Sequence, residues 1–508
     1  MDIEMKSEKI LIKKEKLSVN IEQLIENDIS LADYYGDIVK ILGCSGTANI
    51  FSANVISDKA VIDGNIVIRI IYTDAQGKTE ILENAIPFNR SIDIKNASDN
   101  DNITAVCIGE QINCRAINPR RAEIRGSATL HICVSGTEEK TYISAVPDGF
   151  CHTLGSHHEG WLLQGSAIKN FSLTAECEPD EKYNGAKLSR MSFMPVISEI
   201  KTIRNKMMIK GSITTSLVCI DKNGNYINDR IATPVNQIIE LDGTDENSMC
   251  CVALKIISAE GRITPETPQS ASFPEIPLIV SAEIDVFSKG ELCPVDEAYS
   301  CTHELSCDET KIRFISDIRK INENYPVSSD FEFSSHNIEK TEDISVKRIK
   351  YKCRKENAEL IINGTINYGI IASTKENEKL YFERIADFEL TKPIHDAVSE
   401  IQPVINIHLN ALTFSLKNNS AVTVTAELHT EGFIYSYSNV NVISSIEKTN
   451  ELRRKTSDSV VTVYFASEGE RLWDIAKEHH TGIENIRQLN SINTDFIEKD
   501  CMLIFEQE

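Results

Sequence analysis

A group of metal-ligating side chains lies in the segment DGFCHTLGSHHEGW. A thiol, imidazoles and a carboxylate are ligand types that zinc and copper accept. The group consists of Cys151, His152, His157, His158 and Glu159. Its spacing matches no zinc framework, and the chain has no C-x-x-C motif. A polar loop between two structural units would hold the same residues. We favour that interpretation and predict no metal site, although the sequence leaves metal binding open.

No other pattern in the sequence indicates catalysis. The chain lacks a phosphate-binding G-x-x-x-x-G-K-S/T loop, a G-x-S-x-G nucleophile turn and an H-E-x-x-H zinc motif. An active site needs convergent polar groups, and the repeats described below share none. We therefore predict a protein that is not an enzyme, with no catalytic residues and no cofactor.

Length and charge narrow the class of protein. A chain of 508 residues suggests about three domains. The formal net charge of -23 repels nucleic acid and anionic lipid, so we do not expect nucleic acid as a partner. No apolar run reaches the ~20 residues of a membrane-spanning helix, and the first residues lack the apolar core of a signal peptide. We expect no direct membrane span and a cytoplasmic location.

A threefold internal repeat indicates how the chain is organised. Three segments align without a gap around Gly64, Gly211 and Gly364. In each segment, most residues at even offsets from the glycine can face a core, whereas odd offsets are mostly polar. This period of two is typical of a strand with one buried face. A polar turn and a second strand follow each time, which predicts a hairpin.

The repeat predicts three tandem antiparallel β domains, each a sandwich or a barrel. Their expected bounds are 17–161, 162–316 and 317–446. The middle domain carries the proline-rich segment 263–277, for which we expect an exposed loop. Residues 447–459 contain a single apolar side chain and are predicted to be a linker.

The C-terminal segment, 460–508, predicts a small domain with the order strand, helix, helix, strand. Leu472, Ile475, Ala476 and His479 have the spacing of one helical face. A second short helix ends near Asn490, and the apolar run CMLIF closes the segment as a strand. A domain of this size has a small core and only modest stability.

This C-terminal segment resembles a LysM domain. The residues that carry the resemblance, in order and spacing, are Gly469, Leu472, Trp473, Ile475, Ala476, Leu489 and Asn490. LysM domains bind glycans that contain N-acetylglucosamine, in a groove between the loop before the first helix and the loop after the second. The resemblance places these loops at 469–472 and 492–498.

The sequence departs from the LysM pattern in both loops. The usual Asp-Thr is replaced by Glu470 and Arg471, and the usual Pro-Gly by Lys499 and Asp500. Because a sugar groove needs compact donors, charged loops suit a protein partner better. We expect protein binding, with glycan binding as the alternative. The candidate protein-binding residues are Gly469, Glu470, Arg471, Leu472, Trp473, Lys477, Ile492, Asn493, Thr494 and Asp495.

Three of these candidates have a second interpretation. Trp473 could pack into the small core instead of contacting a partner. Arg471 and Lys477 could be solvated charges, although the spacing of Lys477 keeps it near the helical face of Trp473. The sequence alone does not decide between these roles.

The β repeats resemble SPOCS domains, because Lys40, Ile41 and Leu42 precede the strand that holds Gly64 and Tyr72. Three such domains followed by a LysM domain resemble the SipL-like spore-coat morphogenetic proteins. The resemblance implies a scaffold that acts during sporulation, in the mother-cell cytoplasm at the outer surface of the forespore. It also implies that the partner is the coat-basement ATPase SpoIVA, bound through the LysM domain.

Overall fold

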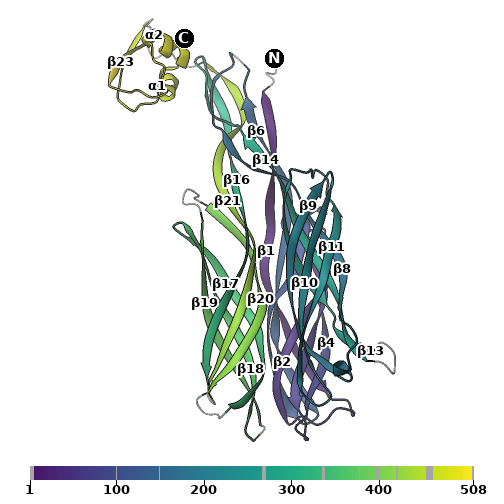
Figure 1. The fold of residues 1–508 in the computed structure, drawn as a ribbon. Coiled ribbons are helices and arrows are strands. Elements are labelled where there is room, and N and C mark those ends of the chain that lie inside the picture. The colour runs from purple at the N-terminus through teal and green to yellow at the C-terminus, as the bar shows by residue number, and fades with distance from the viewer. Residues whose placement is uncertain are drawn as a thin grey trace.

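The structure, a computed structural model, is built almost entirely of β-strands, and its two described α-helices lie near the C-terminal end (Figure 1). The strands form several separate sheets. This arrangement confirms the predicted fold class, mainly β with a small βααβ domain at the end. The structure describes residues 5–98, 100–147, 149–265, 271–333, 338–376, 378–394, 400–418, 421–452 and 461–505.

The first repeat is a sandwich of two three-stranded antiparallel sheets. Its strands are β1 (Lys6–Ser30), β2 (Lys40–Ile56), β3 (Lys59–Thr73), β4 (Thr79–Asp93), β5 (Asn102–Asn118) and β6 (Arg121–Ala145). One sheet has the order β2-β3-β4, and the other has the order β1-β6-β5. Both sheets contribute to one buried apolar core.

The second and third repeats have the same topology. The second contains β8 (His158–Glu176), the 3-10 helix η1 (Glu181–Tyr183), β9 (Lys187–Ile203), β10 (Lys206–Ile220), β11 (Tyr226–Glu240), β12 (Met249–Ala259), β13 (Arg262–Pro265) and β14 (Ser272–Leu292). The third contains β16 (His303–Glu332), β17 (Ile338–Glu356), β18 (Glu359–Thr374), β19 (Lys379–Pro393), β20 (Glu400–Asn418) and β21 (Ala421–Leu452). The central strands of their sheets are β10 and β14 in the second repeat, and β18 and β21 in the third.

The strand register explains the aligned glycines. Gly64 lies opposite Phe88, and Gly364 lies opposite Phe388. A Cβ atom on Gly64 would lie 2.2 Å from the Asn49 carbonyl oxygen and 2.7 Å from the Phe88 ring. The close approach of a neighbouring strand and an aromatic ring therefore requires glycine here.

The repeats pack against one another as well as around their own cores. Leu42, Ile71 and Ile81 from the first repeat form one buried cluster with Ile220 and Ile371 from the other two. This packing covers part of the second face of β3, which holds the residues at odd offsets from Gly64. Arg69 lies on that face and is only 3% exposed. The repeats therefore form a side-by-side assembly (Figure 1).

Several strands run through the points where the sequence places domain boundaries. Strand β8 spans 161/162, and β16 spans 316/317. Strand β21 extends into the expected linker as far as Leu452, and residues 453–459 lie outside the described residues. The boundaries themselves stay predictions.

The proline-rich segment 263–277 differs from the expected loop. Arg262–Pro265 form β13, which pairs with the first part of β14, from Ser272 to Glu275. Prolines are tolerated in strands where their missing N–H is not needed by a neighbour. The prediction of a loop is therefore wrong for the described residues on either side of 266–270.

Two short strands connect the repeats and carry the C-terminal domain. They are β7 (His152–Gly155), between the first and second repeats, and β15 (Val295–Tyr299), between the second and third. They pair with each other in an antiparallel ribbon. The C-terminal domain lies at this end of the elongated molecule, beyond the sandwiches (Figure 1). Neither described helix has the length and apolarity that a membrane crossing requires.

Candidate protein-binding site on the C-terminal domain

The C-terminal domain has the element order that the sequence predicts. It consists of β22 (Thr462–Ala466), α1 (Leu472–His479), α2 (Ile483–Asn490) and β23 (Cys501–Phe505). The core contains Leu472, Ile475 and Ile486 from the helices and Leu503 from β23. The Asn490 side chain links α2 to β23, since it accepts the Ile504 N–H at 2.7 Å and donates to the Ile504 carbonyl at 2.7 Å.

The two loops of the predicted groove are hydrogen-bonded to each other. The Gly469 N–H donates to the Ile497 carbonyl at 2.8 Å, and the Ile497 N–H donates to the Glu470 carbonyl at 2.9 Å. The Leu472 N–H donates to the Asp495 carbonyl at 2.9 Å. These backbone groups are therefore already partnered within the domain.

The charged residues that depart from the LysM pattern also make contacts within the domain. The Glu470 carboxylate accepts hydrogen bonds from the Tyr464 hydroxyl at 3.2 Å and from the Ser467 N–H at 3.1 Å. Asp500 accepts the Glu468 N–H at 2.8 Å. Both substitutions thus stabilise the loop between β22 and α1.

Three candidate site residues contact the carboxylate of Glu297 on strand β15. Glu297 accepts a hydrogen bond from the Trp473 indole N–H at 3.0 Å and one from the Lys477 ammonium at 2.8 Å. The Arg471 guanidinium lies 3.9 Å away. The Lys477 hydrogen bond and, secondarily, that of Trp473 hold the pKa of Glu297 below its usual range, against the effect of partial burial.

An aromatic contact also holds the C-terminal domain against strand β15. Tyr299 packs edge-on against Trp473, with ring centroids 4.9 Å apart. The Tyr299 hydroxyl donates to the Thr481 carbonyl at 2.8 Å. Tyr299 itself is 1% exposed and belongs to the same apolar cluster as the core of the C-terminal domain. The domain therefore docks onto the β7/β15 ribbon through both charge and apolar packing.

The structure places the ten candidate residues in three environments. Gly469, Asn493, Thr494 and Asp495 are exposed; Glu470, Arg471, Lys477 and Ile492 are half-buried; Leu472 and Trp473 are buried. Trp473 packs in the core, and Arg471 and Lys477 face Glu297 of the same chain. Their role toward another protein stays a prediction.

The sequence reasoning did not identify an apolar surface on the same domain. Val463 and Phe465 on β22 lie opposite Ile504 and Met502 on β23. All four point away from the core and are exposed, Phe465 by 76%. The sequence does indicate this surface, because the segments VVTVYFA and CMLIF have apolar residues on both faces of the strand and not on one face only. Exposed apolar patches of this kind mark interaction surfaces.

Four of the five metal-ligating residues around the first connection between repeats do not gather at one point. His152 stacks on Tyr299 with centroids 4.9 Å apart. His158 lies 2.8 Å from the Ser156 hydroxyl, whereas His157 turns toward Glu291 at 3.1 Å. Cys151 packs at the edge of a separate apolar cluster. The group is divided among different contacts.

A polar cavity of about 480 Å³ lies where the three repeats meet. Its lining includes Glu110 from the first repeat, Arg190 from the second and Lys347 from the third. The Lys347 ammonium donates to the Cys44 carbonyl at 2.7 Å. Burial raises the pKa of Glu110 to about 7, and the charges of Lys347 and Arg348 only partly oppose the shift.

Comparisons with known proteins agree with this architecture at two segments. Residues 37–117 match the family model described as SipL, SPOCS domain. Residues 467–498 match the LysM domain. No curated protein matches the chain. The resemblance to a SipL-like protein with a C-terminal LysM domain is therefore confirmed, and the two matched families connect the chain with sporulation.

Proposed function

We propose that the chain is a non-enzymatic scaffold of spore-coat assembly, which binds the coat-basement ATPase SpoIVA through its LysM domain. In this role it tethers or stabilises the coat at the forespore surface, from the mother-cell side. The observation that carries the proposal is the presence of a SipL SPOCS segment and a LysM domain in one chain.

The surface of the LysM domain supports protein binding. The groove loops use their backbone groups on each other, between Gly469 and Ile497 and between Leu472 and Asp495. The exposed apolar face of β22 and β23 offers an area that a protein could cover. A polymeric partner would present many such contacts at once, so that weak single contacts add through effective concentration.

Glycan binding is the second candidate function, and the match to the LysM domain favours it. It requires sugar contacts at the exposed loop residues, such as Asn493 and Thr494. The acidic side chains of Glu470 and Asp500, already hydrogen-bonded within the loop, offer no donors to a sugar.

The test compares the full chain with a variant that lacks 460–508. Both are incubated with purified SpoIVA, and circular dichroism checks that the β repeats stay folded. We expect the deletion to abolish co-purification. Complete retention of the complex by the truncated chain would overturn the proposal.

A second pair of variants separates the two candidate functions within the full chain. Phe465→Glu places a charge on the apolar face, and Glu478→Gln changes an exposed acid of the same domain, outside the groove loops, as a control. We expect only Phe465→Glu to weaken SpoIVA binding. Tight binding of chitin oligomers by the full chain, with no SpoIVA retained, would establish the glycan function instead.

A further inference from the structure

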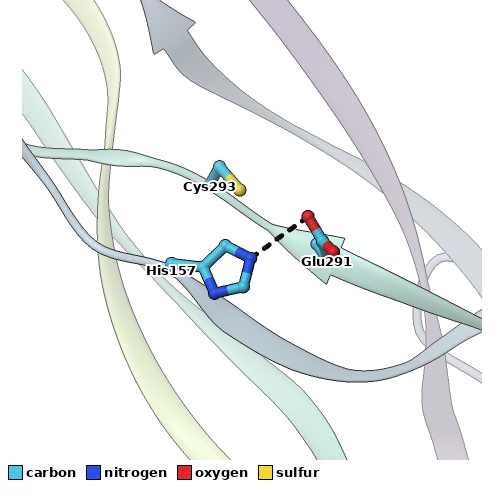
Figure 2. A group of neighbouring side chains, drawn as sticks. All are labelled: His157, Glu291 and Cys293. Atoms are coloured by element: carbon cyan, nitrogen blue, oxygen red, sulfur yellow. Dashed lines mark ion pairs between the residues drawn. The ribbon is translucent and has the colours of Figure 1, made fainter.

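Three side chains of different chemistry meet where the chain enters and leaves the middle repeat. They are His157, Glu291 and Cys293, whose imidazole nitrogen, carboxylate oxygen and thiol sulfur all lie within 4.8 Å of one another. Figure 2 shows the three side chains turned toward a common space, with the contact between His157 and Glu291 marked.

The strand register produces this arrangement. Strands β14 and β8 are antiparallel, with Leu292 opposite His158. One step further along the same register, Cys293 comes opposite His157. Residues directly opposite each other have Cβ atoms ~5 Å apart. Glu291 lies two positions before Cys293 and shares its face, because side chains alternate along a strand.

The backbone around the three residues is held in place. The Ser156 N–H donates to the Pro294 carbonyl at 3.2 Å. The Ser156 hydroxyl donates to the Asp296 carboxylate at 2.9 Å. These contacts join the segment between β7 and β8 to the segment between β14 and β15. The pair Leu292 and His158 joins the same two segments on the other side of the cluster. The three ligand atoms therefore approach one another on a backbone that is already ordered.

We propose that His157, Glu291 and Cys293 form a binding site for a divalent transition metal, with zinc as the preferred ion. Zinc accepts nitrogen, oxygen and sulfur ligands together at about 2.0–2.3 Å, in a tetrahedron that solvent can complete. Magnesium and calcium take oxygen ligands, and of the three residues only Glu291 offers oxygen. Binding requires the thiolate, so the Cys293 thiol releases its proton to solvent as the metal–sulfur bond forms.

Access supports the proposal. The side chains of His157 and Glu291 are 53% and 60% exposed, so an ion can enter from solvent without a change in the fold. The ion would link the connection that leads out of β7 with the connection that leads into β15. It would thereby close the base of the ribbon on which the LysM domain sits. This inference does not depend on the proposed function.

The experiment uses the full chain, kept reduced, stripped with EDTA and desalted. Titration with Co²⁺ reports thiolate ligation as a charge-transfer band in the near ultraviolet, and calorimetry with Zn²⁺ gives the stoichiometry. We expect one equivalent of tightly bound metal and a cobalt–thiolate band. A wild-type chain that binds no metal, or gives no such band, would overturn the proposal.

Variants assign the site to these three residues. Cys293→Ser should remove the band. His157→Gln and Glu291→Gln should each weaken zinc binding by at least about tenfold, because even the loss of a residue that only hydrogen-bonds to a metal ligand costs that much. Cys501→Ser removes an exposed thiol elsewhere and should change nothing. Glu291→Gln is a surface change that leaves the sandwich core intact. Unchanged affinity and band in both Cys293→Ser and Glu291→Gln would show that the metal binds elsewhere and would refute the assignment.

Discussion

The Trp473 indole N–H donates to the Glu297 carboxylate at 3.0 Å, across 176 residues of sequence. This contact fixes the first helix of the LysM domain to the strand that connects the second and third repeats. A tryptophan that the sequence suggests as a partner contact is thus buried in the chain's own structure, at 4% exposure.

Substitution of Glu297 by glutamine should weaken the docking of the LysM domain onto the β7/β15 ribbon. The change removes the negative charge that pairs with Lys477 and Arg471. We expect docking to weaken by about 1 kcal/mol, below the roughly 1.5–3 kcal/mol of hydrogen bonds to charged groups, because the side chain is partly solvent-screened. The chain has two tryptophans, so Trp161→Phe leaves Trp473 as the sole tryptophan, whose emission can be excited selectively. A red-shifted emission and a larger radius by small-angle scattering would report release, and Glu498→Gln serves as the control.

The same carboxylate predicts a pH dependence of docking. The pKa of Glu297 is lowered in the docked state, mainly by the Lys477 hydrogen bond. Its contribution is therefore complete above the ordinary glutamate pKa of about 4.3 and is lost as the pH falls through the lowered value. In the Trp161→Phe background, Trp473 emission followed from pH 7 to pH 3 should change in the acid range when Glu297 is present. A transition of the same size and midpoint in Glu297→Gln would contradict this origin.

Replacement of Trp473 by alanine should unfold the LysM domain and not merely remove a surface contact. Burial of the indole against Tyr299 indicates a cost of about 3–5 kcal/mol, which is large for so small a core. Limited proteolysis should then cleave within 461–505 while the repeats stay resistant. Phe465→Ser, at an exposed position, should leave the domain as resistant as the wild type.

A methyl group at Gly64 should destabilise the first repeat. It would meet the Asn49 carbonyl oxygen and the Phe88 ring at distances that no Cβ tolerates. We expect Gly64→Ala to cost about 1–3 kcal/mol, as overpacking of a core does. Gly165→Ala is the matched control, because its added Cβ has nothing within 4 Å. Equal thermal stability of the two variants would show that β2 and β4 can move apart freely.

Glu110→Gln should stabilise the assembly of repeats at and above neutral pH. With a folded-state pKa raised to about 7 by burial, Glu110 keeps its proton longer in the folded chain than in the unfolded one. The contribution of Glu110 to wild-type stability therefore declines as the pH rises from about 4.3 toward 7. The advantage of the glutamine variant in denaturant unfolding should grow over that interval. Glu26→Gln, exposed on β1, should follow the wild type throughout.

The sequence predicts local structure well where the signal is periodic. The alignment at Gly64, Gly211 and Gly364 identifies the central strands β3, β10 and β18, and the residues at even offsets are buried in all three. The helices of the LysM domain also follow the predicted spacing. Periodicity reports which face of an element is apolar, and each repeat buries that face in its own core.

Contacts between distant segments leave no such signal. The half-buried Glu297 reads as an ordinary surface acid until Trp473 and Lys477 are brought to it. Leu489 has the spacing of the α2 core face, yet it is 50% exposed. Arg69 reads as a solvent-facing charge but is covered, since neighbouring repeats pack side by side. These outcomes depend on tertiary placement, which composition and period do not encode.

The ribbon beneath the LysM domain is made from the two segments that flank the middle repeat. Its strands, β7 and β15, run antiparallel on either side of the interval 158–292. If that interval were excised, the ribbon would become an ordinary hairpin closed by Ser156, His157, Cys293 and Pro294, a loop length common in proteins. The middle sandwich is thus topologically an insertion into a β-hairpin. A chain with only the first and third sandwiches would keep the ribbon onto which the LysM domain docks.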